Sequence, residues 1–150
     1  MAEAILNQKG KPDFTAHSAG SFPTGRVNPF AVKQLEAARL PTSHLRSKSW
    51  DEFARLDAPQ MNFVFTVCDN AAREVCLVWP GQPVTAHWGV SDPAAVAGSP
   101  AQIARAFLDV FVTVDRRIGL LLSLPLSSLD KLALKREIDQ LLRGSRFHQS

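Results

Sequence analysis

A nearly unbroken apolar run, Met61 to Val67, constrains the fold more than any other part of the chain. Its Phe and Val residues are typical of a strand that is buried on both faces of a parallel sheet. Further strands are predicted at Val84 to Trp88 and, shorter, at Phe14 to Ser18. Helical patterns alternate with these strands. The sequence therefore predicts an α/β domain with a short parallel sheet.

Capping residues predict where the helices begin and end. Residues Ala2 to Lys9 are expected to be helical, with Gly10 directly after the last turn. A side-chain oxygen that caps the first turn, or a proline in the first turn, is typical of a helix start. Such starts occur at three places: Asn28-Pro29, Ser49 with Glu52 three residues later, and Ser99-Pro100.

Two long amphipathic helices are predicted in the second half of the chain. The helix from Ser99 has apolar residues at spacings of three and four: Ile103, Phe107, Val110, Phe111, Val114, Ile118 and Leu121. After Pro125, Ser127-Ser128 is predicted to start a last helix, with Leu129, Leu132, Ile138 and Leu141 facing inward. We expect one domain over residues 1–123 and a helical extension, residues 124–150, packed on it.

Composition limits the classes of partner. With 150 residues and 45% hydrophobic side chains, the chain is expected to form one core. Its 17 Lys and Arg and 14 Asp and Glu are scattered, which favours a solvated surface over a nucleic-acid partner. Arg116-Arg117 and Pro125 interrupt the longest apolar stretches below the ~18 residues that span a bilayer, and no signal peptide is recognised. We predict a cytoplasmic protein with no membrane partner.

Cys68 and Cys76 are the only cysteines, and both follow the predicted strand at 61–67. Ligands of open α/β sheets bind beyond the carboxyl ends of the strands. The polar segment 69–75 can coil as one or two helical turns, and a disulfide needs α-carbons within ~7 Å, so a functional pair requires a loop that changes shape. Arg73 and a helix start would favour the Cys68 thiolate. The alternative is two inert packing residues.

A second candidate segment, His87 to Pro93, lies between a predicted strand and the Ser99 helix. Asp92, followed by Pro93, could serve as a general acid for a leaving oxygen. The alternative is an ordinary Asp-Pro turn. His87, next to Trp88, is as consistent with a partly buried, hydrogen-bonded ring as with a catalytic one.

Together these motifs resemble the thioredoxin-coupled arsenate reductases built on the low-molecular-weight tyrosine phosphatase fold. The residues that carry the resemblance are Met1-Ala2-Glu3, Ser18-Ala19-Gly20, Val27-Asn28-Pro29, Phe65 to Ala72, Cys76, Trp79-Pro80, His87-Trp88-Gly89 and Asp92-Pro93. The resemblance implies a flavodoxin-like three-layer sandwich. It also implies that this chain starts just after the family's first strand and anion-binding loop, so that the first strand, the loop nucleophile and its Arg have no counterpart. That strand would lie between the segments 14–18 and 61–67.

The resemblance implies a relay of thiols. The loop cysteine of the family attacks arsenate, Cys68 attacks that sulfur and releases arsenite, and Cys76 then closes a Cys68–Cys76 disulfide. Asp92 matches the general acid. An external dithiol such as thioredoxin reduces the disulfide, and no bound cofactor or metal is expected. Glu3 and Ser18 match two positions that bind a monovalent cation in some members, but no Asp is found at the third position.

Two alternatives stay open. A phosphatase of the same fold would bind a phosphate-like oxyanion, although Ala94-Ala95 follow the Asp-Pro pair here and the chain has no Tyr. A non-catalytic binding or regulatory protein could keep the fold without the loop, and a homodimer could cover exposed sheet edges. Arsenate reduction is the function that the sequence favours.

Overall fold

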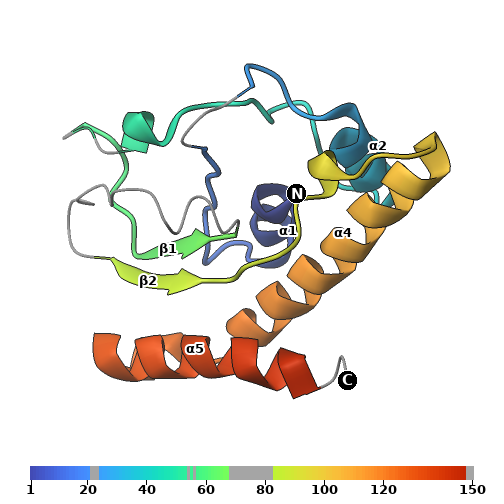
Figure 1. Ribbon diagram of the computed structural model, residues 1–150. Coiled ribbons are helices and arrows are strands. Elements are labelled where there is room, and N and C mark those ends of the chain that lie inside the picture. The colour runs from blue at the N-terminus through green and yellow to red at the C-terminus, as the bar shows by residue number, and fades with distance from the viewer. Residues whose placement is uncertain (21–23, 54, 56, 68–82, 148–150) are drawn as a thin grey trace. The chain divides into compact units, whose positions relative to one another are not determined.

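The computed structural model describes residues 1–20, 24–53, 55, 57–67 and 83–147. The chain divides into two compact units, one made of Met1–Trp50 with Ser91–Gly119 and the other of Asp51–Val90 with Leu120–Ser150. Helices and a parallel sheet are both present, which confirms the predicted α/β class (Figure 1). The predicted boundary between residues 123 and 124 stays a prediction.

The sheet belongs to the second unit. Strands β1 (Phe63–Thr66) and β2 (Val84–His87) are parallel, with Phe63 opposite Val84 and Thr66 opposite His87. Both strands were predicted from the sequence. The prediction that the first is buried on both faces is wrong, because all four residues of β1 are only half-buried. Among the described residues the sheet has just these two strands, so β1 has one hydrogen-bonded neighbour.

Helix α5 (Lys131–Phe147) packs against β2. Figure 1 shows it running beneath the sheet. Its start differs from the prediction at Ser127-Ser128, because residues Leu126–Ser128 form a 3-10 turn, η3, and the carboxylate of Asp130 accepts the amide hydrogen of Ala133 at 2.8 Å. The inward face differs in part. Ile138 is buried, as predicted, but Leu132 is 70% exposed and Leu134, which was not predicted to face inward, is buried.

Three helices build the first unit: α1 (Ala2–Lys9), α2 (Pro29–Ala37) and α4 (Pro100–Leu122), of which residues up to Gly119 belong here. All three were predicted. Asn28 caps α2 by accepting the amide hydrogen of Phe30 at 2.9 Å. Ser99 and Gln102 cap α4 reciprocally, because each side chain accepts the other residue's backbone N–H. None of the helices in the described ranges is both long and apolar enough to cross a membrane.

Helix α4 holds the other two helices through its side chains. Phe107 stacks on Phe30 of α2, with ring centroids 5.9 Å apart, and Asp115 forms an ion pair of 2.6 Å with Lys9 of α1. The buried apolar residues of the unit come from all three helices: Ala4, Ile5, Ala31, Leu35, Phe107, Val114 and Ile118. At the end of α1, Gly10 is required by space, because a Cβ there would lie 2.7 Å from the carbonyl oxygen of Leu6.

Two predicted elements of this unit are different in the structure. The segment 14–18 is not a strand, because the carboxamide of Asn7 bonds both the N–H and the C=O of Ala16, at 2.8 and 3.0 Å. A side chain of α1 therefore satisfies the groups that a neighbouring strand would use. At Ser49 the described residues form only a 3-10 turn, η1 (Trp50–Phe53), since Ser49 pairs with Gly20 in a parallel bridge.

Candidate functional site

Cys68 and Cys76 both lie outside the described residues, as does the whole segment between them. The helical turns, the influence of Arg73 and the disulfide therefore stay predictions. The description ends at Val67, the residue before Cys68, and resumes at Pro83. What the structure describes is the framework from which this segment starts.

That framework contains a polar pair, Thr66 and His87, which we call the strand-end pair. Thr66 is the last residue of β1 and His87 the last residue of β2. Their side chains form a hydrogen bond of 2.7 Å between Oγ1 and Nδ1. Because the strands are parallel and the two residues share a register position, both side chains lie at the carboxyl edge of the sheet. Both are half-buried.

The backbone beyond the strand-end pair departs from a regular ladder. The N–H of Trp88 bonds the carbonyl of Thr66 at 2.7 Å, and the N–H of Val90 bonds the carbonyl of Val67 at 2.8 Å. In a regular strand two consecutive carbonyls point to opposite edges, so two that accept from the same neighbouring segment indicate a bulge. The ladder therefore shifts by one residue at this point, and Gly89 is the additional residue, on the segment after β2.

An aromatic contact also joins the ends of the two strands. Trp88 is buried, and its ring lies 4.2 Å from that of Phe65, measured between centroids. The contact packs the segment after β2 onto β1 one residue before the strand-end pair. Ordinary side-chain packing and three hydrogen bonds thus hold the ends of both strands together.

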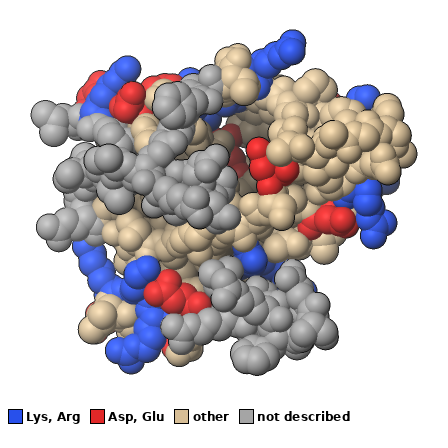
Figure 2. Space-filling view, in the orientation of Figure 1, with Lys and Arg blue, Asp and Glu red and all other residues tan. Residues whose placement is uncertain are grey.

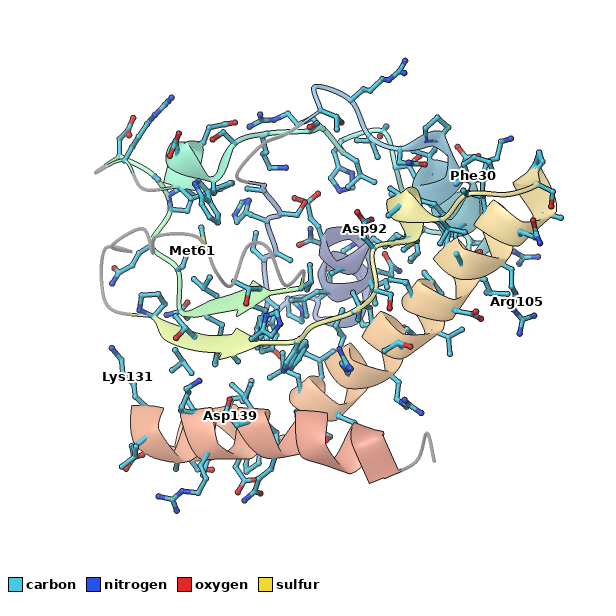
Figure 3. All side chains as sticks on the ribbon, in the orientation of Figure 1. Phe30, Met61, Asp92, Arg105, Lys131 and Asp139 are labelled. Atoms are coloured by element: carbon cyan, nitrogen blue, oxygen red, sulfur yellow. The ribbon has the colours of Figure 1, made fainter. Side chains whose placement is uncertain are left out.

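Asp92 lies where its Asp-Pro sequence predicts, in the loop between β2 and α4 (Figure 3). Its carboxylate accepts the N–H of Ala94 at 2.9 Å and so caps η2, the short 3-10 helix Pro93–Ala95. The side chain is exposed. An oriented, accessible carboxyl group is compatible with the predicted general acid and equally with an ordinary turn.

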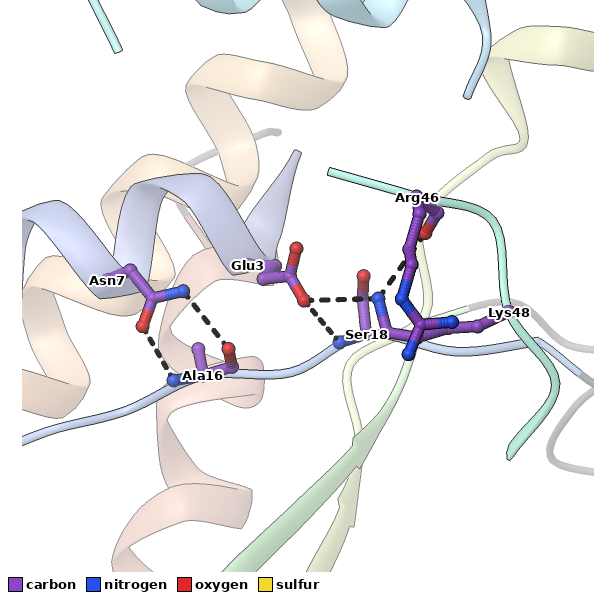
Figure 4. A network of polar contacts seen from close by, with 6 residues as sticks. All are labelled: Glu3, Asn7, Ala16, Ser18, Arg46 and Lys48. Atoms are coloured by element: carbon purple, nitrogen blue, oxygen red, sulfur yellow. Dashed lines mark hydrogen bonds and ion pairs between the residues drawn. The ribbon is translucent and has the colours of Figure 1, made fainter. Parts of the chain in front are cut away.

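A buried polar network occupies the first unit (Figure 4). We call it the Glu3 network: Glu3, Ser18, Arg46 and Lys48. An Oε1 oxygen of Glu3 accepts the N–H of Ser18 at 3.0 Å and lies 3.4 Å from Nζ of Lys48. Lys48 Nζ also donates to the carbonyl of Arg46 at 3.3 Å. The side chains of Glu3 and Lys48 are 7% and 5% exposed.

The Glu3 network includes Glu3 and Ser18, the two residues that match monovalent-cation positions of the family named in the sequence analysis. Glu3 and Ser18 do meet, but the positive charge beside them is the ammonium of Lys48. The Met1 α-amino group also interacts electrostatically with this carboxylate. Burial lowers the pKa of that amino group below 8.0, and attraction to Glu3 partly offsets the shift.

Other kinds of site are weaker in the described ranges. No three His, Cys, Asp or Glu side chains there converge in a way that could hold a metal ion. On the face seen in Figure 2, acidic and basic side chains are interspersed. A surface depression of about 490 Å³ in the first unit is lined in part by Asn7, which already bonds Ala16, and by exposed Lys11 and His44.

A comparison with protein families identifies the family to which the chain belongs. The low molecular weight phosphotyrosine protein phosphatase family matches residues 1–137. The chain belongs to this family. No curated protein matches the chain. Among solved structures it is similar to the crystal structure of arsenate reductase from Archaeoglobus fulgidus DSM 4304, with 24% sequence identity and a TM-score of 0.56. The similarity covers 79% of this chain and 87% of that chain.

Membership of the phosphatase family confirms the fold that the sequence resemblance implied, a flavodoxin-like α/β architecture. In such a fold the carboxyl edge of the sheet is the expected place for a ligand. The strand-end pair lies at that edge, and the two cysteines follow Thr66 and precede His87 along the chain.

Sequence reasoning gave little weight to His87 and did not consider Thr66 or Lys48. Thr66 and His87 each lie one residue before the end of a predicted strand, 61–67 and 84–88, but only the observed register, which pairs Thr66 with His87, brings them together. No comparable signal marks Lys48. Its partner Glu3 is 45 residues away and belongs to a different element.

Proposed function

We propose that this chain is an arsenate reductase-like thiol-disulfide oxidoreductase in which Cys68 and Cys76 form the redox pair. The observation that carries the proposal is the position of two cysteines directly after β1 in a chain of the phosphatase family. Hydrolysis of a phosphate ester transfers no electrons, whereas reduction of arsenate needs two. A pair of thiols on one segment supplies them.

The net reaction balances with these residues alone. Arsenate loses one oxygen as water and its arsenic gains two electrons. Cys68 and Cys76 each lose a hydrogen as their sulfurs join. Asp92 donates the proton that the departing oxygen needs and is reprotonated from solvent, which takes up the hydrogens of the two thiols as protons, so that it ends unchanged. The arsenate-binding cysteine of the relay is not among these 150 residues, in which the pair are the only cysteines.

Reduction of the disulfide needs an external dithiol of the thioredoxin type, which returns two hydrogens and becomes a disulfide itself. No bound cofactor takes part in this scheme. A pair that cycles in this way belongs in a reducing compartment, and a cytoplasmic location is part of the proposal.

The similar solved structure is an arsenate reductase, which favours the reductase. At 24% sequence identity, however, the similarity shows the fold and not the activity. The family name favours the phosphatase. An experiment must therefore separate the two activities. We would extend the chain at Met1 with a strand and a cysteine-containing anion loop, and assay arsenite release and aryl-phosphate hydrolysis side by side.

The reductase predicts that Cys68→Ser and Cys76→Ser each abolish multiple-turnover arsenite release and leave any aryl-phosphate hydrolysis unchanged. Mass spectrometry of the 150-residue chain should also show a Cys68–Cys76 disulfide that thioredoxin reduces. Aryl-phosphate hydrolysis without arsenite release would instead identify a phosphatase. Neither activity, with no disulfide, would favour the non-catalytic binding protein.

A further inference from the structure

The Glu3 network brings a carboxylate oxygen and a carbonyl oxygen to one buried point. Oε1 of Glu3 lies 3.4 Å from Nζ of Lys48, and the carbonyl oxygen of Arg46 lies 3.3 Å from the same nitrogen (Figure 4). Oxygens of these two kinds are also the ligands of hard metal cations in proteins. A buried carboxylate needs a positive charge beside it. The chemistry of this point therefore suits a small cation, and the structure places an ammonium group there.

The residues do not fit an additional, free monovalent cation of the kind that the family resemblance associates with Glu3 and Ser18. Ser18 reaches the carboxylate with its backbone N–H, at 3.0 Å, and the residue is exposed. Oε1 of Glu3 thus already has two donors, this N–H and the ammonium of Lys48. A free cation at the same oxygen would be repelled by that ammonium, because like charges at close range interact strongly where water is excluded.

We propose that the Lys48 ammonium is a built-in counter-ion that replaces a bound monovalent cation, so that folding of the chain does not depend on potassium. A tethered ammonium is beside Glu3 at any salt concentration, whereas the occupancy of a free ion depends on its concentration. The side chain of Lys48 is only 5% exposed, so little of it is open to exchange with ions from solvent. The inference goes beyond the proposed function and is independent of it, because neither cysteine takes part.

Lys48→Met isolates the ammonium from the rest of the side chain. Methionine is also unbranched but ends one heavy atom earlier, so the variant removes Nζ and keeps most of the apolar stem. The oxygens of Glu3 and Arg46 then face a vacated position of ammonium size. Potassium and the free ammonium ion are similar in size and can fill it, whereas choline is too large. The built-in counter-ion therefore predicts that the first two ions stabilise this variant and that choline does not.

The measurement is urea unfolding of the full chain in potassium, ammonium and choline chloride at equal ionic strength. We expect the parent protein to have the same folding equilibrium constant in all three salts. For Lys48→Met, potassium at ten times its dissociation constant should raise that constant about tenfold over choline, by mass action. Glu3→Gln/Lys48→Met should not respond, because it lacks the carboxylate. Lys135→Met removes a much more exposed ammonium and should behave like the parent.

Two results would overturn the inference. Stabilisation of the parent protein by potassium over choline would show that a free cation binds in spite of Lys48. Equal stability of Lys48→Met in all three salts would show that the Lys48 ammonium does not occupy a cation position. If this variant is unfolded in choline chloride, circular dichroism tests whether potassium restores its helices, and a failure to do so has the same meaning. Because no activity is measured, the proposed function can fail while this inference stands, and the reverse.

Discussion

The Glu3 network and the strand-end pair are both polar, yet they differ in burial and in what they hold. In the Glu3 network a carboxylate and an ammonium are almost fully buried and fasten α1 to the segments around Ser18 and Lys48. In the strand-end pair, two half-buried neutral or weakly basic groups cap a backbone ladder that is already formed. In the Glu3 network a side chain takes the place of a main-chain partner for the N–H of Ser18, whereas the strand-end pair adds a side-chain bond to strands that are already paired. We therefore expect the first to contribute more to the free energy of unfolding than the second.

The largest expected effect tests the buried network. Lys48→Met should lower the free energy of unfolding by about 3–5 kcal/mol, because it leaves the carboxylate of Glu3 buried without its charged partner. Urea denaturation measures the change. Lys135→Met is the control, since Lys135 and Asp139 are nearly half exposed and such pairs contribute less than about 1 kcal/mol.

The double variant Glu3→Gln/Lys48→Met sharpens this prediction. Removing both charges should recover much of the stability lost in Lys48→Met, because no unpaired charge stays buried. A loss in Lys48→Met no greater than in the Lys135 control would show that water reaches the Glu3 network in solution.

The next effect concerns the side chain that takes the place of a strand. Asn7→Ala should destabilise the protein by about 2 kcal/mol, since it removes both bonds to Ala16 and leaves two backbone groups without that partner. Gln8→Ala, an exposed position on the same helix, should have little effect. Equal unfolding midpoints for the two variants would mean that the segment 14–18 is held by other contacts.

A smaller effect is expected at the strand ends. Thr66→Val should change the free energy of unfolding by about 1 kcal/mol at most, because the backbone bonds of Trp88 and Val90 remain. Thermal unfolding compares it with Thr85→Val. If Thr66→Val costs as much stability as Lys48→Met, the contrast between the two regions is wrong and the strand-end pair is a structural element.

The smallest change in stability is predicted for Asp92→Asn. The amide oxygen of Asn can still accept the N–H of Ala94, so the unfolding midpoint should be unchanged. Arsenite release by the extended chain should fall by about 10²–10⁴-fold, because an amide cannot donate the proton of a general acid. If this variant keeps the activity of the parent, Asp92 is not the general acid and its carboxylate only caps the turn.

Local signals predicted most helix starts correctly. Asn28 caps α2, and Ser99 caps α4, through bonds to residues two and three positions away. At α5 the same reasoning predicted a start at Ser127-Ser128, whereas Asp130 caps the helix, and the predicted inward face is wrong at Leu132, which is exposed, and lacks Leu134, which is buried. Several polar residues before an apolar stretch are interchangeable as caps by type, and packing against β2 selects among them.

The candidate site was predictable to the extent that it follows strand ends and turns. Asp92 lies in the expected loop, and the strands that precede Cys68 and include His87 were both identified. The bond between Thr66 and His87 was not predicted, because it depends on the register of two strands 21 residues apart. The pairing of Cys68 with Cys76 stays a prediction.

The order of helices and strands, the caps within a few residues and the two-cysteine segment follow from the sequence by itself, because they depend on short stretches of chain. Only the tertiary structure decided that Asn7 substitutes for a strand partner, that Lys48 neutralises Glu3, and which face of α5 is buried. Each of these depends on groups that are distant in the sequence. Their pairing is determined by which buried polar group must be satisfied once the helices and strands have packed.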